Sequence, residues 1–335
     1  MVFYEKIYYF CAMNTIHVAI ISKSDDLPVL YSESFFHSAR LFSVVENTPS
    51  QWPYMVIAYD GDMPVAHLLV IMRRRGSLVP PYLFTQARIY GEGIYADGYN
   101  KEELFSYMLQ SIVKKFSKGL CLYIEFSEMS SKMFGYKTFR DNGFFPVHWM
   151  EIHNSLHSKH PRQRLSHKMR LYLVQAHKLN MTAHDAQDDS HLDSFYRMLV
   201  RYSTDGLRRF IPDKSMFRQL INNGDAHLYY TLYKDKMVAG CISIDSANDC
   251  YLWYITAKKN IYRKRAIALS AWTAISHAYQ QNRRHIYFMD VGLPFRKNRF
   301  RDFILRFGGK PVGTYRWFRC SVKWLNKLLT WIYRE

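Results

Sequence analysis

The sequence predicts an α/β protein made of two similar halves, each a mixed, twisted sheet flanked by helices. The observations behind this fold class are the length of 335 residues, the apolar content, and hairpin, helix and strand patterns that recur in order. The length is about twice that of one compact domain. With 48% hydrophobic residues and only 15 Gly and 11 Pro, the chain can fill two cores. This composition excludes a disordered or small disulfide-stapled protein.

The internal repeat begins with two similar hairpins. In the first, apolar stretches flank an Asp-Gly pair, Asp60-Gly61, which suits a tight turn between strands. Each hairpin is followed by a helix and a strand. The expected elements are hairpins over 55–70 and 228–244, a strand over 251–256, helices over 100–116 and 269–279, and strands over 120–126 and 285–290.

The ends of the two halves also correspond. Phe139-Arg140-Asp141 precedes Pro146, and Phe300-Arg301-Asp302 precedes Pro311, 165 residues further along. Several matches in the same order favour duplication over chance. The boundary is expected in the polar segment 153–165, near His157, which predicts an N-terminal domain over 1–157 and a C-terminal domain over 158–335.

Charge and cysteine usage indicate the environment. Lys and Arg number 46 against 28 Asp and Glu, a net charge of +18 that attracts phosphates or anionic lipid. The five cysteines form no CxxC pair, so we expect reduced thiols. We find no signal peptide pattern and no apolar run of spanning length. The expected location is the cytoplasm, either free or at the surface of the inner membrane.

Several motifs lie in a characteristic order along the chain: 122–126, 142–146, 168–178, 195–196, 212–220, 287–292 and 306–309. With the order of elements, they resemble the GNAT acyltransferase fold, in which two neighbouring parallel strands splay and the acyl donor enters the gap. Two such domains in tandem resemble the Fem-type (FemAB-like) peptidyl transferases, which add amino acids to cell-wall precursors. The sequence departs from that family in two ways: Phe303-Ile304 replaces the family's aromatic-Lys pair, and no coiled-coil insertion separates the halves.

The resemblance implies an N-acyltransferase that moves an aminoacyl or acyl group onto an amine of an anionic cell-envelope precursor, either peptidoglycan or a surface polysaccharide. It implies no tightly bound cofactor and either aminoacyl-tRNA or acyl-CoA as co-substrate. The expected partner is an anionic small-molecule or lipid-linked substrate. If the donor is aminoacyl-tRNA, tRNA is a further partner. No DNA is expected. An acyl-CoA-dependent N-acetyltransferase acting on an amino sugar is the alternative, and a non-catalytic RNA-binding module is the alternative from another class.

The donor is expected at the start of the helix after the second hairpin. The resemblance aligns the family's pyrophosphate loop with Arg263 to Ala268, where Ala266 replaces a glycine. Arg263, Lys264 and Arg265 could hold a phosphate by their side chains, and Tyr254 precedes them on the donor side. The alternative is an exposed helix end, although cations there oppose the helix dipole.

The catalytic groups are expected after the last parallel strand, at a carboxyl end, where open α/β sheets usually bind ligands. Asp290 could accept a proton or orient the amine, with loop capping as its alternative role. Arg296 and Arg301 would hold the anionic substrate. In the first half, Arg88, Tyr90 and Glu92 lie where the resemblance places the acceptor, with an ordinary loop as the alternative. Glu125 and Arg140 could form an internal ion pair.

Two remaining features have ordinary interpretations. The linker histidines include His153 and His157 at i, i+4 spacing, but no acid or cysteine accompanies them, so we expect solvated residues and no metal site. Residues 323–334 form an amphipathic helix rich in Trp. Docking on its own domain is the favoured interpretation, and peripheral membrane contact through Trp324 and Trp331 is the alternative.

Overall fold

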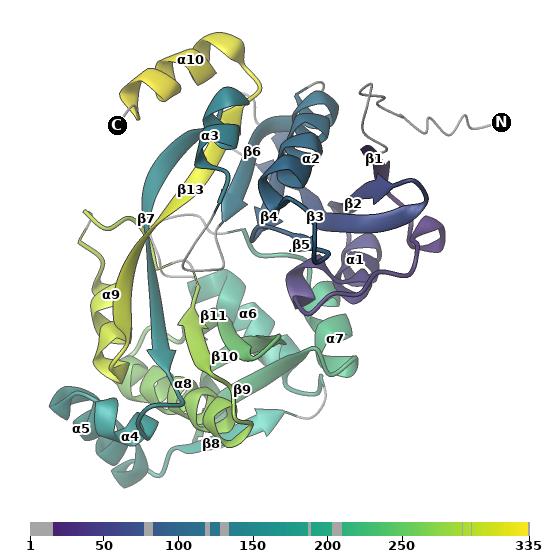
Figure 1. Cartoon of the computed structure of the whole chain (residues 1–335). Helices are drawn as coiled ribbons and strands as arrows, with labels where there is room; N and C mark the ends of the chain where they lie inside the picture. Colours follow the sequence, from purple (N-terminus) through teal and green to yellow (C-terminus); the bar gives the residue numbers. More distant parts are fainter. Residues whose placement is uncertain are drawn as a thin grey trace. The chain divides into compact units, whose positions relative to one another are not determined.

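The computed structural model describes residues 16–76, 83–117, 121–127, 134–186, 189–202, 210–289, 291–295 and 297–333. The chain forms two compact units (Figure 1). Unit 1 contains the chain up to His148 together with the segment from Thr314 onward, and unit 2 contains Trp149–Gly313. We describe each unit by itself.

Unit 1 is a sheet with the strand order β1-β2-β3-β4-β6-β13, and the short β5 pairs with β3. Neighbours are antiparallel except for β4 and β6, which are parallel. The elements are β1 Ile16–Ile21, α1 Ala39–Glu46, β2 Gln51–Asp60, β3 Met63–Gly76, β4 Leu83–Tyr90, β5 Ile94–Tyr95, α2 Lys101–Phe116, β6 Cys121–Ser127, α3 Tyr136–Asp141, β7 Phe145–Ser155, β13 Lys310–Cys320 and α10 Lys323–Ile332.

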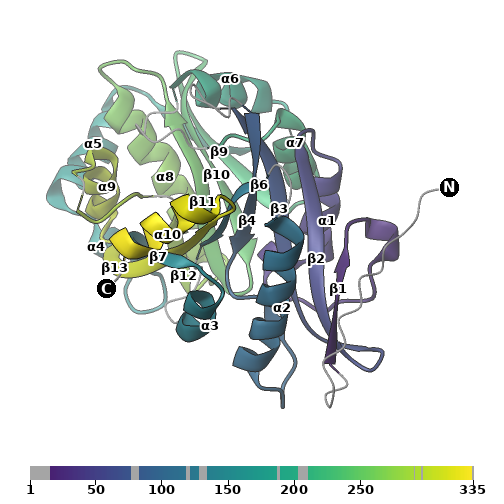
Figure 2. The same cartoon turned by 90° about the horizontal axis from the view of Figure 1, so that it is seen from above.

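Both faces of the sheet are buried at β2, because neighbouring apolar residues of this strand point to opposite faces. Val56 and Ala58 of β2 belong to the core beneath α2, whereas Met55 and Ile57 point to the opposite face and are also buried. Figure 2 shows α2 along the strands of unit 1. The predicted cap of this helix is confirmed: the Asn100 side chain accepts hydrogen bonds from the first backbone N–H groups.

Unit 2 is a sheet with the strand order β7-β12-β11-β10-β9-β8. Here β11 and β12 are parallel, and the other neighbours are antiparallel. The elements beyond β7 are α4 Pro161–Arg164, α5 His167–Lys178, β8 Thr182–Ala186, α6 Leu192–Tyr202, α7 Lys214–Asn222, β9 Ala226–Tyr233, β10 Lys236–Ser246, β11 Asp249–Ala257, α8 Arg263–Gln280, β12 His285–Phe288 and α9 Arg299–Ile304.

Helices cover the unit 2 sheet on both faces. α8 packs on β9, β10 and β11, and α5 packs beside it, in one apolar core (Figure 1). Five alanines on α8 are buried, which lets its backbone lie close to the sheet. α6 and α7 contact the same strands through buried residues that are not part of that core. Unit 2 therefore has three layers.

The two sheets have the same topology, which confirms the predicted duplication. From the outer edge inward, each has three antiparallel pairings, then one parallel pairing, then one antiparallel pairing. In each unit the parallel pair is connected through the long helix, α2 or α8. Such a crossover is what parallel strands require.

The last strand of each half departs from the expected division. β7 follows the unit 1 elements along the chain, but its residues Ile152–Ser155 pair with β12 of unit 2. β13 follows the unit 2 elements, but its residues Arg316–Cys320 pair with β6 of unit 1. The compact units therefore differ from the expected domains 1–157 and 158–335, because each half donates its final strand to the sheet of the other.

The C-terminal helix α10 is attached to unit 1 by one face only. The Asn326 side chain donates to the Gly143 carbonyl and accepts from the Cys320 N–H, and the Tyr333 ring stacks on Phe145. No residue of α10 is buried, and Trp324 and Trp331 are 68% and 69% exposed. The apolar face of α10 therefore remains in solvent. No helix among the described residues is long and apolar enough to cross a bilayer.

The described cysteines are free thiols, in agreement with the expected reduced state. Cys121, Cys241 and Cys250 are buried, and Cys320 is partly buried. Burial raises the pKa of Cys121 to about 11 and that of Cys241 further. These thiols therefore behave as small apolar residues at neutral pH.

A substitution at Gly308 tests how closely the backbone packs around this residue in the second repeat. Its φ is +88°, and an added Cβ would lie 2.4 Å from the Arg164 carbonyl oxygen. We expect Gly308→Ala to lower the free energy of unfolding by at least about 2 kcal/mol, because strain at positive φ adds to a backbone clash. Gly61→Ala, with positive φ but open space around it, should cost only about 1 kcal/mol. Denaturant unfolding measures both variants, and an equal loss of unfolding free energy in the two would contradict this explanation.

Candidate functional site

The parallel strands of unit 2 separate partway along their length. β11 and β12 are in register from Asp249 and His285 to Leu252 and Phe288, and the Met289 N–H donates to the Leu252 carbonyl at 3.2 Å. β11 continues to Ala257, and the described residues show no parallel pairing beyond Leu252. Within the described residues, which leave out Asp290, the pairing of β11 with β12 thus ends near the middle of β11, as the resemblance implies for the strands of a GNAT sheet.

A β-bulge in β11 lies where the strands separate. Ser243 of β10 is opposite Leu252, and the preceding Ile242 is opposite Tyr254, so Trp253 is the extra residue. A bulge bends its strand and increases the local twist. The bulge therefore bends β11 at the point where its pairing with β12 ends.

Beyond the bulge, β11 presents backbone donors to the gap. The Lys258 N–H donates to the Val238 carbonyl at 2.9 Å, so residue 258 faces β10. Hydrogen-bonding direction alternates along a strand, and therefore the N–H groups of Ile255 and Ala257 face the side that β12 has left. Fixed donors of this kind can stabilise the oxyanion of an acyl-transfer intermediate.

The corresponding strands of unit 1 stay together. β4 and β6 remain in register to Tyr90 and Ser127, and the Gly91 N–H donates to the Ser127 carbonyl at 2.7 Å. The register shifts only at the start of the pair, between Thr85 and Gln86. Within the described residues, the parallel pair of unit 1 therefore has no gap like that of unit 2.

A buried charge network joins the closed strands of unit 1. Glu125 on β6 forms ion pairs with Arg88 on β4 and, at 3.3 Å, with Arg316 on β13. The Gln86 amide also donates to Glu125. The expected pairing of Glu125 with Arg140 is wrong, because Arg140 instead donates to the Tyr136 hydroxyl at 2.9 Å. Three strands are thus cross-linked by one carboxylate.

The acceptor-side residues lie along and just after β4. Arg88 is buried in the Glu125 network, and its guanidinium lies 4.8 Å from the centre of the buried Tyr90 ring. Glu92 is partly buried, its Oε2 has no hydrogen-bond partner among the described residues, and burial raises its pKa. The structure brings Arg88 and Tyr90 together. Their contact with an acceptor stays a prediction.

The donor-side residues differ in availability. Arg265 is engaged, because it donates to Gln175 at 2.8 Å and to the Ile261 carbonyl at 3.0 Å. Lys264 is exposed, and the Nε of Arg263 is buried without a hydrogen-bond partner in the described chain. No side chain caps the start of α8. Arg263 and Lys264 are therefore better placed than Arg265 to bind a phosphate.

Tyr254 lies directly after the bulge. Its hydroxyl donates to the Phe210 carbonyl at 2.8 Å, and its ring packs edge-on against Phe217 of α7 at 5.3 Å. These contacts fix the strand beside the gap. Tyr254 thus holds β11 against α7 and the segment at Phe210, and its role on the donor side stays a prediction.

Two of the three predicted catalytic residues, Asp290 and Arg296, lie outside the described residues. Arg301 is buried on α9, and its guanidinium donates to the Leu293 carbonyl. Asn298 caps α9 and donates to the Val291 carbonyl at 3.0 Å. Arg301 and Asn298 therefore hold Leu293 and Val291, which follow β12 at its carboxyl end.

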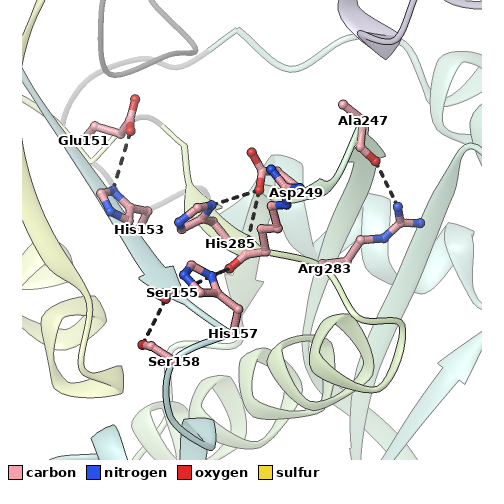
Figure 3. Close-up of polar contacts among 10 residues, drawn as sticks. Glu151, His153, Ser155, His157, Ser158, Ala247, Asp249, Arg283 and His285 are labelled. Carbon is pink, nitrogen blue, oxygen red and sulfur yellow. Dashed lines mark hydrogen bonds and ion pairs between the residues drawn. The ribbon is translucent and has the colours of Figure 1, made fainter.

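Of the linker histidines, His153 is partly buried, whereas His157 is exposed as expected. Figure 3 shows His153, His157 and His285 gathered near Asp249, which lies 3.1 Å from the Nδ1 of His285. The rings of His153 and His157 are 5.5 and 5.2 Å from that of His285. Burial lowers the pKa of His153. This cluster lies where β11 and β12 begin, at the end opposite the gap.

Comparison with known proteins identifies the fold. Residues 159–297 match the family model "Acetyltransferase (GNAT) domain". No curated protein matches the sequence. Three solved structures are similar to the chain: FemX, the C-terminal domain of an Agrobacterium fabrum protein named as a lysylphosphatidylglycerol synthetase, and a glucosamine N-acetyltransferase region of a fungal multi-domain β-N-acetylglucosaminidase.

These likenesses are structural. FemX has a TM-score of 0.61 and 11% identity over 92% of this chain and 96% of that chain. The Agrobacterium fabrum domain has a TM-score of 0.56 and 10% identity over 88% and 91%. The fungal region has a TM-score of 0.52 and 13% identity over 92% and 38%. Such low identity shows a shared fold, and the GNAT fold predicted from the sequence is confirmed.

The Glu125 network gives a testable consequence. We expect Glu125→Gln to lower the free energy of unfolding by about 3 kcal/mol or more, because the buried ion pairs of this carboxylate with Arg88 and Arg316 would be lost. Glu103→Gln, on the exposed surface of α2, should change it by less than about 0.5 kcal/mol. Denaturant titration measures both. A loss below 1 kcal/mol for Glu125→Gln would show that the network is not a stabilising element.

Proposed function

We propose that this acyltransferase, whose residues 159–297 form a GNAT domain, transfers an aminoacyl or acyl group to an amine of an anionic cell-envelope precursor. The separation of β11 from β12 beyond Leu252 is the observation that carries the proposal. It leaves an opening lined by backbone donors within the matched domain. The neighbours FemX and lysylphosphatidylglycerol synthetase support the envelope as the setting.

The chemistry requires few side chains. The acceptor amine attacks the donor carbonyl, a C–N bond forms, and the N–H groups of Ile255 and Ala257 stabilise the oxyanion. When the intermediate collapses, the C–S bond of an acyl-CoA or the C–O bond of an aminoacyl-tRNA breaks. The amine proton passes to a base, for which Asp290 is our candidate, and the leaving thiolate or alkoxide is protonated.

Both candidate donors carry phosphates, which Arg263 and Lys264 would bind at the start of α8. Cations are unfavourable at a helix N-terminus unless an anion compensates them, so a donor phosphate would relieve this position. The GNAT family uses acyl-CoA. The absence of a coiled-coil insertion also favours acyl-CoA over aminoacyl-tRNA for this chain.

The second candidate is an N-acetyltransferase that transfers the acetyl group of acetyl-CoA to an amino sugar. The similarity to the glucosamine N-acetyltransferase region favours it, as does the name of the matching domain. A GNAT domain with an open parallel pair argues against the non-catalytic RNA-binding module. The positive charge of +18 suits an anionic substrate as well as RNA.

The decisive experiment follows mass transfer. The protein is incubated with acetyl-CoA or with aminoacyl-tRNA, together with a nucleotide-linked peptidoglycan precursor or glucosamine, and the products are weighed by mass spectrometry. An increase in precursor mass by one amino-acid residue or acyl group supports the leading proposal. Acetylation of glucosamine alone supports the second candidate, and no transfer to either acceptor contradicts both.

The same assay tests the donor site. We expect Arg263→Ala/Lys264→Ala to raise the donor KM about tenfold, which corresponds to the loss of one charge-assisted contact worth about 1.4 kcal/mol. Arg284→Ala, which removes an exposed cation beside the other end of α8, is the matched control and should leave KM unchanged. An unchanged KM in the double variant would remove the first turn of α8 from the donor site.

We also propose that α10 rests on an anionic membrane surface. Trp324, Leu328, Trp331 and Ile332 recur on one helix face and are exposed, while Asn326 ties the other face to unit 1. Lys323 and Lys327 are exposed on the same helix. Trp with flanking cations suits a lipid interface, where a lipid-linked acceptor would be presented.

Vesicle binding tests the role of α10. We expect Trp324→Ala/Trp331→Ala to weaken binding to vesicles of phosphatidylglycerol and phosphatidylcholine by at least about tenfold, because two large apolar side chains no longer enter the interface. Trp52→Ala removes another partly exposed Trp and serves as the control. Equal sedimentation of both variants with the vesicles would contradict the proposal, as would a lack of binding by the unaltered protein.

A further inference from the structure

Three potential metal ligands from separate elements of unit 2 converge at one point. They are Asp185 on β8, His227 on β9 and His277 on α8, and one ligand atom of each lies within 4.8 Å of the other two. We propose that they bind a divalent transition-metal ion of the zinc type. The proposal concerns a site that the transfer reaction does not use.

The sheet register explains the convergence. Asp185 is opposite Tyr229 in the β8–β9 pair, and His227 is two residues before Tyr229. The side chains of Asp185, His227 and Tyr229 are therefore on the same face of the sheet. The Tyr229 hydroxyl is hydrogen-bonded to Nδ1 of His277, which brings α8 onto that face. The alternation of the strands and the position of α8 thus direct the carboxylate and both imidazoles to one place.

The spacing of the ligand atoms suits a metal better than direct pairing. Nδ1 of His227 is 3.8 Å from Oδ2 of Asp185, which is too long for a hydrogen bond. In a tetrahedral site with bonds of about 2.0–2.1 Å, neighbouring ligand atoms are about 3.3 Å apart. Side-chain movements of about 1 Å or less would bring the atoms to that separation, since all three groups are only half-buried.

The environment of the Asp185 carboxylate is a second observation that points to a bound cation. Its Oδ1 is buried and has no hydrogen-bond partner among the described residues. Burial raises the pKa of this carboxyl, which the nearby His227 and His277 partly offset. A buried carboxylate oxygen without a donor is unfavourable, and a coordinated ion would satisfy it.

Neighbouring residues hold one imidazole in place. The Tyr229 hydroxyl contacts Nδ1 of His277, and the Gln281 amide lies 3.3 Å from its Nε2. A bound ion would replace one of these two contacts, and the other contact would hold the ring. Ordered partners of this kind orient metal ligands. Two imidazoles and one carboxylate suit zinc and related ions, whereas magnesium prefers oxygen ligands alone. A water molecule could complete the coordination at this half-exposed position.

The site would be structural. His277 is 14 residues after Arg263 on α8, which is about 21 Å along the helix. The ion would therefore lie far from the start of α8 and would join this helix to the edge strand β8 and its neighbour β9. Its expected effect is to stabilise unit 2 without entering the transfer step.

Zinc binding to the full chain, measured without substrates, tests the inference. After chelator treatment, the protein is dialysed against Zn²⁺, and bound metal is counted by mass spectrometry. We expect one equivalent more in the unaltered protein than in Asp185→Asn/His227→Gln. His184→Ala, an exposed neighbour on β8, should keep that equivalent, and His157→Ala measures binding by the linker histidines. Equal zinc content in the unaltered protein and the double variant would overturn the proposal.

Thermal unfolding and Co²⁺ absorption give independent readouts. We expect Zn²⁺ at one hundred times its Kd to raise the unfolding midpoint of the unaltered protein by about 5 °C and Mg²⁺ to leave it unchanged. If the double variant fails to fold, the visible spectrum of the Co²⁺-loaded unaltered protein decides. A tetrahedral spectrum supports the site, and the spectrum of Co²⁺ in buffer overturns it.

Discussion

The separation of β11 and β12 is the constraint on which the functional part of the structure depends. Parallel strands lose their mutual hydrogen bonds when they separate, so the opening requires a structural cause. The extra residue Trp253 provides it by bending β11, while continued pairing with β10 keeps the bent strand in the sheet. One side of β11 thus remains paired with β10, and the N–H groups of Ile255 and Ala257 on its other side are the donors that our proposal assigns to the oxyanion.

The same topology gives a different result in unit 1. There β4 and β6 remain paired to the end, and the carboxylate of Glu125 joins Arg88, Arg316 and Gln86 across the strands. A buried charged group needs its partners, and these partners come from three different strands. Duplication therefore supplied two similar sheets. Among the described residues, only the second sheet has parallel strands whose pairing ends before the longer strand does.

Because the two halves exchange their final strands, each half needs the other to complete its sheet. β7 completes the sheet of unit 2, and β13 completes that of unit 1. Neither half of the chain, cut at residue 157, carries all the strands of its own sheet. Separate expression of residues 1–157 or 158–335 would leave a sheet edge without the strand that covers it.

The sequence by itself determined the two hairpins, the long helix and strand that follow each of them, and the repetition of this order. Apolar periodicity, the Asn100 cap and the Asp60-Gly61 turn are local signals, and local signals are sufficient to specify hairpins and helices. Other features depend on pairing between residues far apart in the chain: the bulge at Trp253, the partners of Glu125, the strand exchange, and the meeting of Asp185 with His227 and His277. No spacing rule connects such residues. Only the tertiary structure, through sheet register and the placement of α8, decided which of them are in contact.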